Sequence, residues 1–189
     1  MSDFHFQSMY ELAPDETVYR KLSDEGISVT SFEGEDVLKV EGDVLADLAA
    51  AAIHDVSHLF RTGHLEQLAA ILDDPEASDN DRFVAREMLK NANVSAGMVL
   101  PSCQDTGTAI VMGKRGQYVW TDGEDEEHLS RGVFDTYTGT NLRYSQVAPK
   151  TMFDEANTKT NLPAQVEIMA QKGSTYNFHF MAKGGGSAN

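Results

Sequence analysis

The segment with the most reactive side chains runs from Leu100 to Thr108 and reads LPSCQDTGT. Cys103, Gln104 and Asp105 place a thiol, an amide and a carboxylate side by side, just before a glycine. Polar side chains at the exit of a strand are well placed to face a cleft, where a thiolate binds metal and a carboxylate handles protons. The same pattern also fits a buried structural cysteine beside a turn-forming aspartate.

Two further segments carry groups suited to binding an anion. Arg143 lies in the polar stretch NLRYSQ, and its planar guanidinium can bind a carboxylate through two hydrogen bonds. Gly184 to Gly186 follow a β-rich run, and successive glycines can turn several backbone N–H groups toward one anion. Each feature has a plain alternative, because an arginine often forms a surface ion pair and Gly-Gly-Gly-Ser is also typical of a linker.

Two other patterns are interpreted as structural. His54 and His58 have the spacing of two metal ligands on one helix face, but Asp55 stands where a zinc-protease helix has glutamate. We therefore interpret the two histidines as core or surface residues. Lys114 and Arg115 lie between glycines, but the spacing of a phosphate-binding P-loop is absent.

The composition limits the classes of partner. A formal net charge of -15 and a sequence pI near 4.6 disfavour nucleic acid and anionic membrane surfaces. The single cysteine excludes an internal disulfide and cannot complete a zinc or iron site by itself. Met1 to Glu16 lacks the pattern of a signal peptide, and no stretch approaches the ~20 apolar residues of a membrane span. These features predict a cytoplasmic protein.

The elements that must position these side chains change in type near Gly97. Before it, apolar residues recur with mainly helical period. The sequence predicts, in order, an edge hairpin of Ile27 to Phe32 and Val37 to Val40, a helix from Asp43 with Gly63 just past its end, a helix over Leu65 to Leu72, and a helix opening at Ser78.

After Gly97 the pattern becomes that of strands, interrupted by one helix and one long polar segment. Four acids at Glu124 to Glu127 suit the start of a solvated helix, and Asn141 to Pro163 is predicted to be a functional or disordered loop. The predicted strands are Met98 to Leu100, Ala109 to Met112, Tyr118 to Trp120 after a turn at Gly113 to Gly116, Val166 to Ala170, and Tyr176 to Met181. The predicted fold class is therefore α+β, with amino-terminal helices packed on a mixed β-sheet formed mainly by the second half.

Four motifs, taken in order, resemble those of the class I fumarases. They are LPSCQDTGTA from Leu100, NLRYSQ from Asn141, NTKTNLPAQ from Asn157 and AKGGGSAN from Ala182. Each motif is short, but four in this order, preceded by DPEASDND from Asp74, make chance improbable. Under this resemblance the final glycines belong to an enzyme and not to a linker.

The resemblance implies reversible hydration of fumarate to L-malate, a step of the tricarboxylic acid cycle, with a 4Fe-4S cluster held by three cysteine thiolates. An iron with an open position acts as a Lewis acid on the substrate. The resemblance implies Cys103 as the first cluster ligand, and Gln104, Asp105, Arg143 and the backbone N–H of Gly186 as substrate-binding groups. Asp105 is also the catalytic candidate, with proton transfer and orientation both open as its role.

Residues 1–189 are expected to form the amino-terminal catalytic-half domain of a longer protein. In the family the other two cluster cysteines, the catalytic base and further cations lie downstream, so the expected partners are a small dicarboxylate and a downstream domain of the same chain. A homodimer is left open. The 189 residues alone are expected to lack a stable cluster and to be inactive.

Two alternative functions stay open at this point. A hydratase of a related dicarboxylate, tartrate or mesaconate, shares the chemistry, although tartrate dehydratases use a separate, shorter subunit. A non-catalytic dicarboxylate-binding or regulatory module is the alternative from another class. If the enzyme reading holds, Cys103, Gln104, Asp105, Arg143 and Gly186 should converge on one concave surface, because catalytic groups must surround one substrate.

Overall fold

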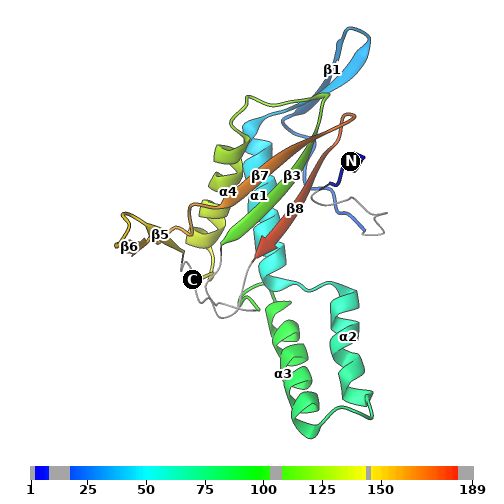
Figure 1. The fold of residues 1–189 in the computed structure, drawn as a ribbon, viewed down its shortest axis with the longest axis vertical. Coiled ribbons are helices and arrows are strands. Elements are labelled where there is room, and N and C mark those ends of the chain that lie inside the picture. Colours follow the sequence, from blue (N-terminus) through cyan, green and yellow to red (C-terminus); the bar gives the residue numbers. More distant parts are fainter. Residues whose placement is uncertain (1–2, 9–17, 103–107, 144–145, 183–189) are drawn as a thin grey trace.

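The computed structural model describes residues 3–8, 18–102, 108–143 and 146–182. A three-stranded sheet forms its centre (Figure 1). Its middle strand β3 (Ala109–Gly116) pairs in parallel with β7 (Gln165–Gln171) and antiparallel with β8 (Tyr176–Ala182). The predicted α+β class with a mixed sheet from the second half is confirmed.

Two helices pack against each other and on one face of this sheet. They are α1 (Gly42–His58) and α4 (Asp125–Gly139), seen behind the strands in Figure 1. Their contact is close, because a Cβ added to Gly132 of α4 would lie 2.2 Å from the Ala46 carbonyl oxygen of α1. The core lies between helices and sheet and includes the fully buried side chains of Leu45, Ile53, Val111, Leu129 and Val133.

A second three-stranded sheet carries a hairpin that projects from one end of the molecule (Figure 1). β1 (Ile27–Phe32) and β2 (Glu35–Val40) form the predicted hairpin, and β2 also pairs in parallel with β4 (Val119–Trp120). The two-residue turn has positive φ at both positions, 52° at Glu33 and 87° at Gly34. Positive φ at both central residues is what a type I′ hairpin turn requires.

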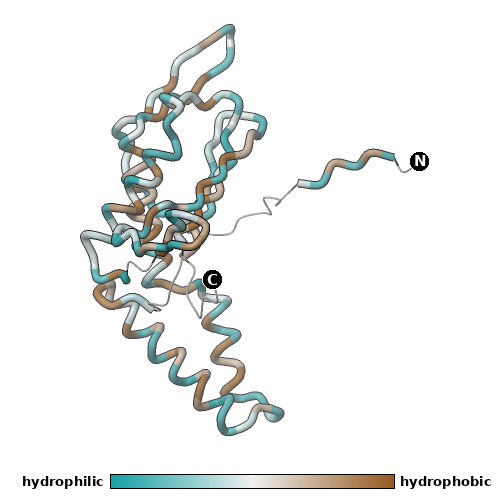
Figure 2. Tube along the Cα trace, turned by 60° about the vertical axis from the view of Figure 1, so that its left-hand side comes forward, coloured by the Kyte–Doolittle hydropathy of each residue, from teal (hydrophilic) through white to brown (hydrophobic). Residues whose placement is uncertain are grey.

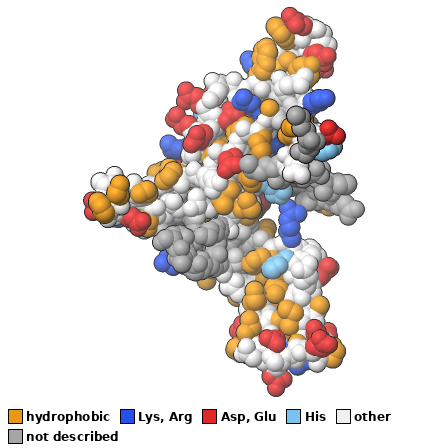
Figure 3. Space-filling view, in the orientation of Figure 1, with side chains coloured by type: hydrophobic (Ala, Val, Ile, Leu, Met, Phe, Trp, Pro, Cys, Tyr) orange, Lys and Arg blue, Asp and Glu red, His pale blue; other side chains and the backbone are white. Residues whose placement is uncertain are grey.

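The helices α2 (Thr62–Asp73) and α3 (Asp79–Ser95) form a helical hairpin that projects beyond the sheet (Figures 1 and 2). Ser78 caps α3 reciprocally with Asp81, as the sequence predicts. Hydrophobic side chains gather on this part of the surface in Figure 3. An open groove of about 610 Å³ lies between the two helices, and α2 buries none of its residues.

Several boundaries differ from the sequence prediction. Helix α1 ends at His58, and Gly63 lies in the first turn of α2 instead of past a helix end. The N–H groups of a first helical turn have no intrahelical partner in any case, so glycine is tolerated there. The predicted strand at Met98 to Leu100 is wrong, because Met98 has a left-handed φ of 61° and the segment bends.

Two loop predictions also change. Gly113 to Gly116 is not a turn but the second half of β3, where small residues admit close neighbours. A Cβ on Gly116 would lie only 2.3 Å from a backbone oxygen. The segment 141–163 contains a small two-stranded sheet of β5 (Val147–Pro149) and β6 (Glu155–Asn157). Within the described ranges, no helix combines the length and apolar character that a membrane crossing needs.

Candidate functional site

The described residues that belong to or flank the four sequence motifs meet at one end of the central sheet, which we call the motif end. β3 begins at Ala109, directly after the first motif's Thr108, and pairs in register with Ala182, where the fourth motif begins. β7 runs parallel to β3 and begins at Gln165, the last residue of the third motif. Helix α4 ends at Gly139, just before the second motif. Segments far apart in sequence are thus brought together by strand pairing.

The first motif is attached to the end of α1. The backbone N–H and the hydroxyl of Ser102 both donate to the carbonyl oxygen of Ser57, at 2.9 and 3.2 Å. The last carbonyls of a helix have no partner within the helix, so this contact satisfies one of them. The hydroxyl of the fully buried Ser95 donates to the next carbonyl, that of His58, at 2.8 Å. The chain just before Cys103 therefore starts from a fixed position.

The second motif is anchored by Leu142, which is buried in the core cluster that contains Ala109 and Tyr137. Arg143, the predicted carboxylate-binding residue, follows directly and is exposed at the motif end. The side chain of Asn141 donates 3.0 Å to the Val99 carbonyl oxygen, which lies just upstream of the first motif. Arg143 therefore projects from a well-fixed segment.

The third motif also packs at this end. Leu162 and Ala164 pack against the same core cluster, as does Phe180 of β8. Asn161 is completely buried and has a positive φ of 57°. Asparagine tolerates this left-handed region better than most residues, which suits a tight turn into β7.

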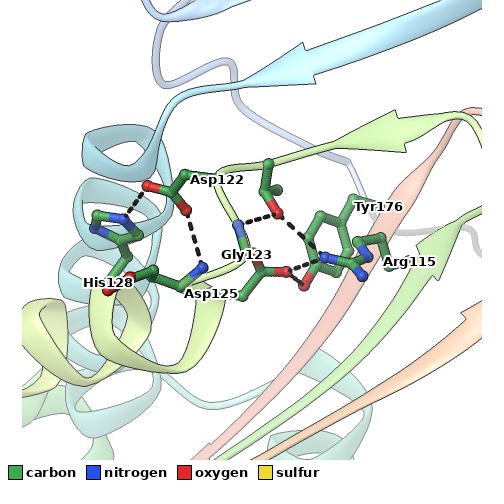
Figure 4. A network of polar contacts seen from close by, with 8 residues as sticks. Arg115, Asp122, Gly123, Asp125, His128 and Tyr176 are labelled. Carbon is green, nitrogen blue, oxygen red and sulfur yellow. Dashed lines mark hydrogen bonds and ion pairs between the residues drawn. The ribbon is translucent and has the colours of Figure 1, made fainter.

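A polar network lies at the opposite end of the sheet (Figure 4). Asp125 Oδ2 accepts hydrogen bonds from Arg115 at 3.0 Å and from the Tyr176 hydroxyl at 2.6 Å. Burial, and then the hydrogen bond to Asp125, raise the pKa of Tyr176 above its ordinary value. Asp125 is only 5 % exposed, so the prediction of a wholly solvated acidic helix start is wrong at this position. Its partners lie in strands, and no local signal in the sequence points to them.

The interpretation of the histidines as structural fits the described geometry. His58 is buried, and its Nδ1 lies 2.7 Å from the His54 carbonyl oxygen of the same helix. Among the described residues, no three His, Cys, Asp or Glu side chains are grouped so as to hold a metal ion.

Residues 46–189 match the family model described as fumarate hydratase (Fumerase). The chain belongs to the fumarate hydratase family. Over 186 residues it is 53% identical to the class I, aerobic fumarate hydratase of Escherichia coli (strain K12), covering 98% of this chain and 34% of that protein. The predicted resemblance is confirmed.

Two relatives from Leishmania major agree with this assignment. Fumarate hydratase 2 is 51% identical over 193 residues, and the mitochondrial fumarate hydratase 1 is 50% identical over 192 residues. Each alignment covers 100% of this chain but only 34% and 35% of the relatives. This fumarate hydratase family chain therefore spans about a third of the length of the curated relatives it matches.

Of the five predicted site residues in this family member, the structure describes Arg143. Cys103, Gln104, Asp105 and Gly186 lie outside the described residues. Their convergence therefore stays a prediction, although the described residues that flank each motif meet at the motif end. The contacts at Ser57 and Ser95 that organise this end were missed by sequence reasoning, because serine carries no distinctive local pattern.

Proposed function

We propose that the protein is a hydro-lyase that adds water reversibly to fumarate to give L-malate. The observation that carries this proposal is membership of the fumarate hydratase family over residues 46–189. The meeting of the motif flanks at one end of the sheet supports it, because groups that act on one small substrate must be close together.

In this proposal Arg143 binds one substrate carboxylate. Its neighbour Leu142 is buried and fixes the backbone from which the guanidinium projects. A planar guanidinium binds a carboxylate through two parallel hydrogen bonds and thereby orients it. Because the chain carries a net charge of -15, its overall field repels a dianion, so binding depends on local cations such as this one.

Gln104 and Asp105 are proposed to face the substrate, and the backbone N–H of Gly186 is proposed to donate to a substrate oxygen. Hydration of a double bond requires a proton at one carbon and an oxygen at the other. The Asp105 carboxylate has the chemistry either to move that proton or to hold a donor in place. Gln104 can donate and accept hydrogen bonds through its amide.

The proposed cofactor is a 4Fe-4S cluster, which supplies a Lewis-acidic iron when bound. The donor set of this chain fits such a group only in part, because Cys103 is its single cysteine. Cys103 would supply one thiolate, and the others must come from the rest of the protein, which we propose as the partner domain of residues 1–189. We also propose that the protein is a cytoplasmic enzyme of the tricarboxylic acid cycle. One of the Leishmania major relatives is named as a mitochondrial enzyme.

The test replaces Arg143 in the full-length protein. Arg143→Met should lower kcat/KM for fumarate by roughly 10- to 100-fold, because the substrate carboxylate loses its hydrogen bonds to the charged guanidinium. Arg131→Met is the matched control, because Arg131 pairs with Asp135 on the surface of α4 and should leave kcat/KM unchanged. Assays with mesaconate and tartrate alongside fumarate identify the substrate. An unchanged kcat/KM for Arg143→Met on every substrate would contradict the assignment.

A further inference from the structure

Gln146 contacts two other motifs from a single position in the chain. Its side-chain Oε1 accepts a hydrogen bond of 3.0 Å from the hydroxyl of Thr108, the residue that ends the LPSCQDTGT segment. Its backbone carbonyl accepts a hydrogen bond of 3.0 Å from the N–H of Thr158, in the third motif. The Thr108 contact joins residues 38 positions apart, so it is a tertiary contact and not a local turn.

The two residues that form this hydrogen bond each lie directly before a β-strand. Thr108 precedes Ala109, which is completely buried and starts β3. Gln146 precedes Val147, which starts β5 and pairs with Asn157 of β6. A hydrogen bond between two side chains on fixed backbones requires less further ordering than one between mobile segments. The contact therefore links the residue just before β3 to the residue just before β5.

The other described end of the cysteine motif is held independently. Ser102 donates twice to the Ser57 carbonyl, and Asn141 donates to the Val99 carbonyl. Among the contacts described for the two flanks of the motif, those of Ser102 and Val99 lie on its upstream side. Gln146 thus supplies the matching contact at the downstream end.

From these contacts we infer that Gln146 is a positioning residue for the cysteine motif, acting through the Thr108 hydroxyl. In this role it touches no substrate or reacting atom. The inference rests on the proposed function, which assigns the cysteine motif its role in catalysis. The effect of the hydrogen bond on the reactivity of Cys103 can be measured independently of catalysis.

The experiment measures how fast iodoacetamide alkylates Cys103 in the iron-free, full-length protein, with the modified peptide resolved by mass spectrometry. Thr108→Val removes the hydroxyl and keeps the side-chain shape, and Gln146→Met removes the acceptor. Each should raise the alkylation rate roughly two- to tenfold, because loss of one half-buried hydrogen bond shifts local opening by about that factor. The double variant should match the single variants, because all three lose the same bond.

Conservative variants and a remote control separate positioning from general damage. Thr108→Ser and Gln146→Glu keep a hydroxyl and an acceptor, so their rates should stay within about twofold of the parent. Thr138→Val loses a hydroxyl that donates 2.8 Å to the Phe134 carbonyl in α4, and should leave Cys103 alkylation unchanged. If Thr108→Val fails to fold, Gln146→Met carries the comparison.

Two results would overturn the inference: unchanged alkylation in Gln146→Met, or effects of Thr108→Val and Gln146→Met that multiply in the double variant. Iron retention by the full-length protein in the presence of a chelator gives a second readout, expected to fall in the same two variants and to recover in Thr108→Ser. If the parent protein neither binds iron nor hydrates fumarate, the proposed function fails, while the alkylation comparison still decides the role of Gln146.

Discussion

The imidazole of His128 joins the beginnings of two helices. Its Nε2 lies 2.8 Å from Asp122 Oδ2 (Figure 4). A Cβ added to Gly42 would lie 2.0 Å from the ring. The hydrogen bond to Asp122 is the main cause that raises the pKa of His128, and the nearby charges of Glu127 and Asp43 act in the same direction. Acidic groups from the loop before α4, from α4 and from α1 therefore all favour the protonated ring.

This arrangement predicts a pH dependence of stability. Because the pKa of His128 is raised above 6.5 on folding, its contribution is fully present below about pH 6.5 and is lost as the pH rises through the folded-state value. The pKa of Asp122 is lowered, first by the Glu124 N–H and then by His128, so its contribution is lost only as the pH falls below 3.8. The melting temperature of His128→Gln should fall furthest below the parent near pH 5 and approach it near pH 8.

Melting curves of the parent and His128→Gln at matched pH values give the measurement. A difference that is the same at both pH values, or larger at pH 8, would show that the ring acts only by packing against Gly42. Salt should reduce the difference near pH 5, because the pair is partly exposed.

At the scale of elements, the crossing of α1 and α4 depends on one glycine. Gly132→Ala would place a methyl group 2.2 Å from the Ala46 carbonyl oxygen, which is backbone and cannot move aside cheaply. Helix propensity alone favours alanine by about 1 kcal/mol. Overpacking in a tight core costs about 1–3 kcal/mol, so the substitution should lower the free energy of unfolding.

Gly139→Ala at the end of the same helix is the control for this prediction. A Cβ there meets nothing within 4 Å, so the free energy of unfolding should stay equal or rise by up to about 1 kcal/mol. Chemical denaturation of both variants measures the two signs. Stabilisation by Gly132→Ala would mean that the helices separate at little cost.

The elements that the sequence predicts well are those whose signals are local. Ser78 and Asp81 mark the start of α3 because the capping contacts lie within four residues. Gly113 and Gly116 instead admit neighbours from distant segments to β3, and the turn that their local spacing predicts is wrong for that reason. The order of the four motifs is plain in the sequence, but the meeting of their described flanks at one end depends on the pairing of β3 with β7 and β8. That pairing is set by tertiary contacts and not by any one motif.

At the scale of the whole molecule, the cysteine content sets what these residues can hold. One thiolate cannot replace the three of the proposed cluster, so residues 1–189 alone should retain no stoichiometric iron or sulfide after anaerobic reconstitution. The full-length protein should retain both and hydrate fumarate. Metal analysis, visible absorbance and a hydration assay on the two proteins make the comparison, and a fully loaded 189-residue protein with turnover would refute the proposed ligand set.

The hydrogen bond between Ser102 and Ser57 also bears on how the chain tolerates changes of length. It joins residues 45 positions apart, and the whole α2–α3 hairpin lies in the interval that it closes. The entropy of closing such an interval grows only logarithmically, by about 0.6 kcal/mol for each doubling of length. Helical turns can therefore be added to or removed from α2 and α3 together at a small cost in loop-closure free energy. The chain still returns to the end of α1 at Ser102, the residue before Cys103.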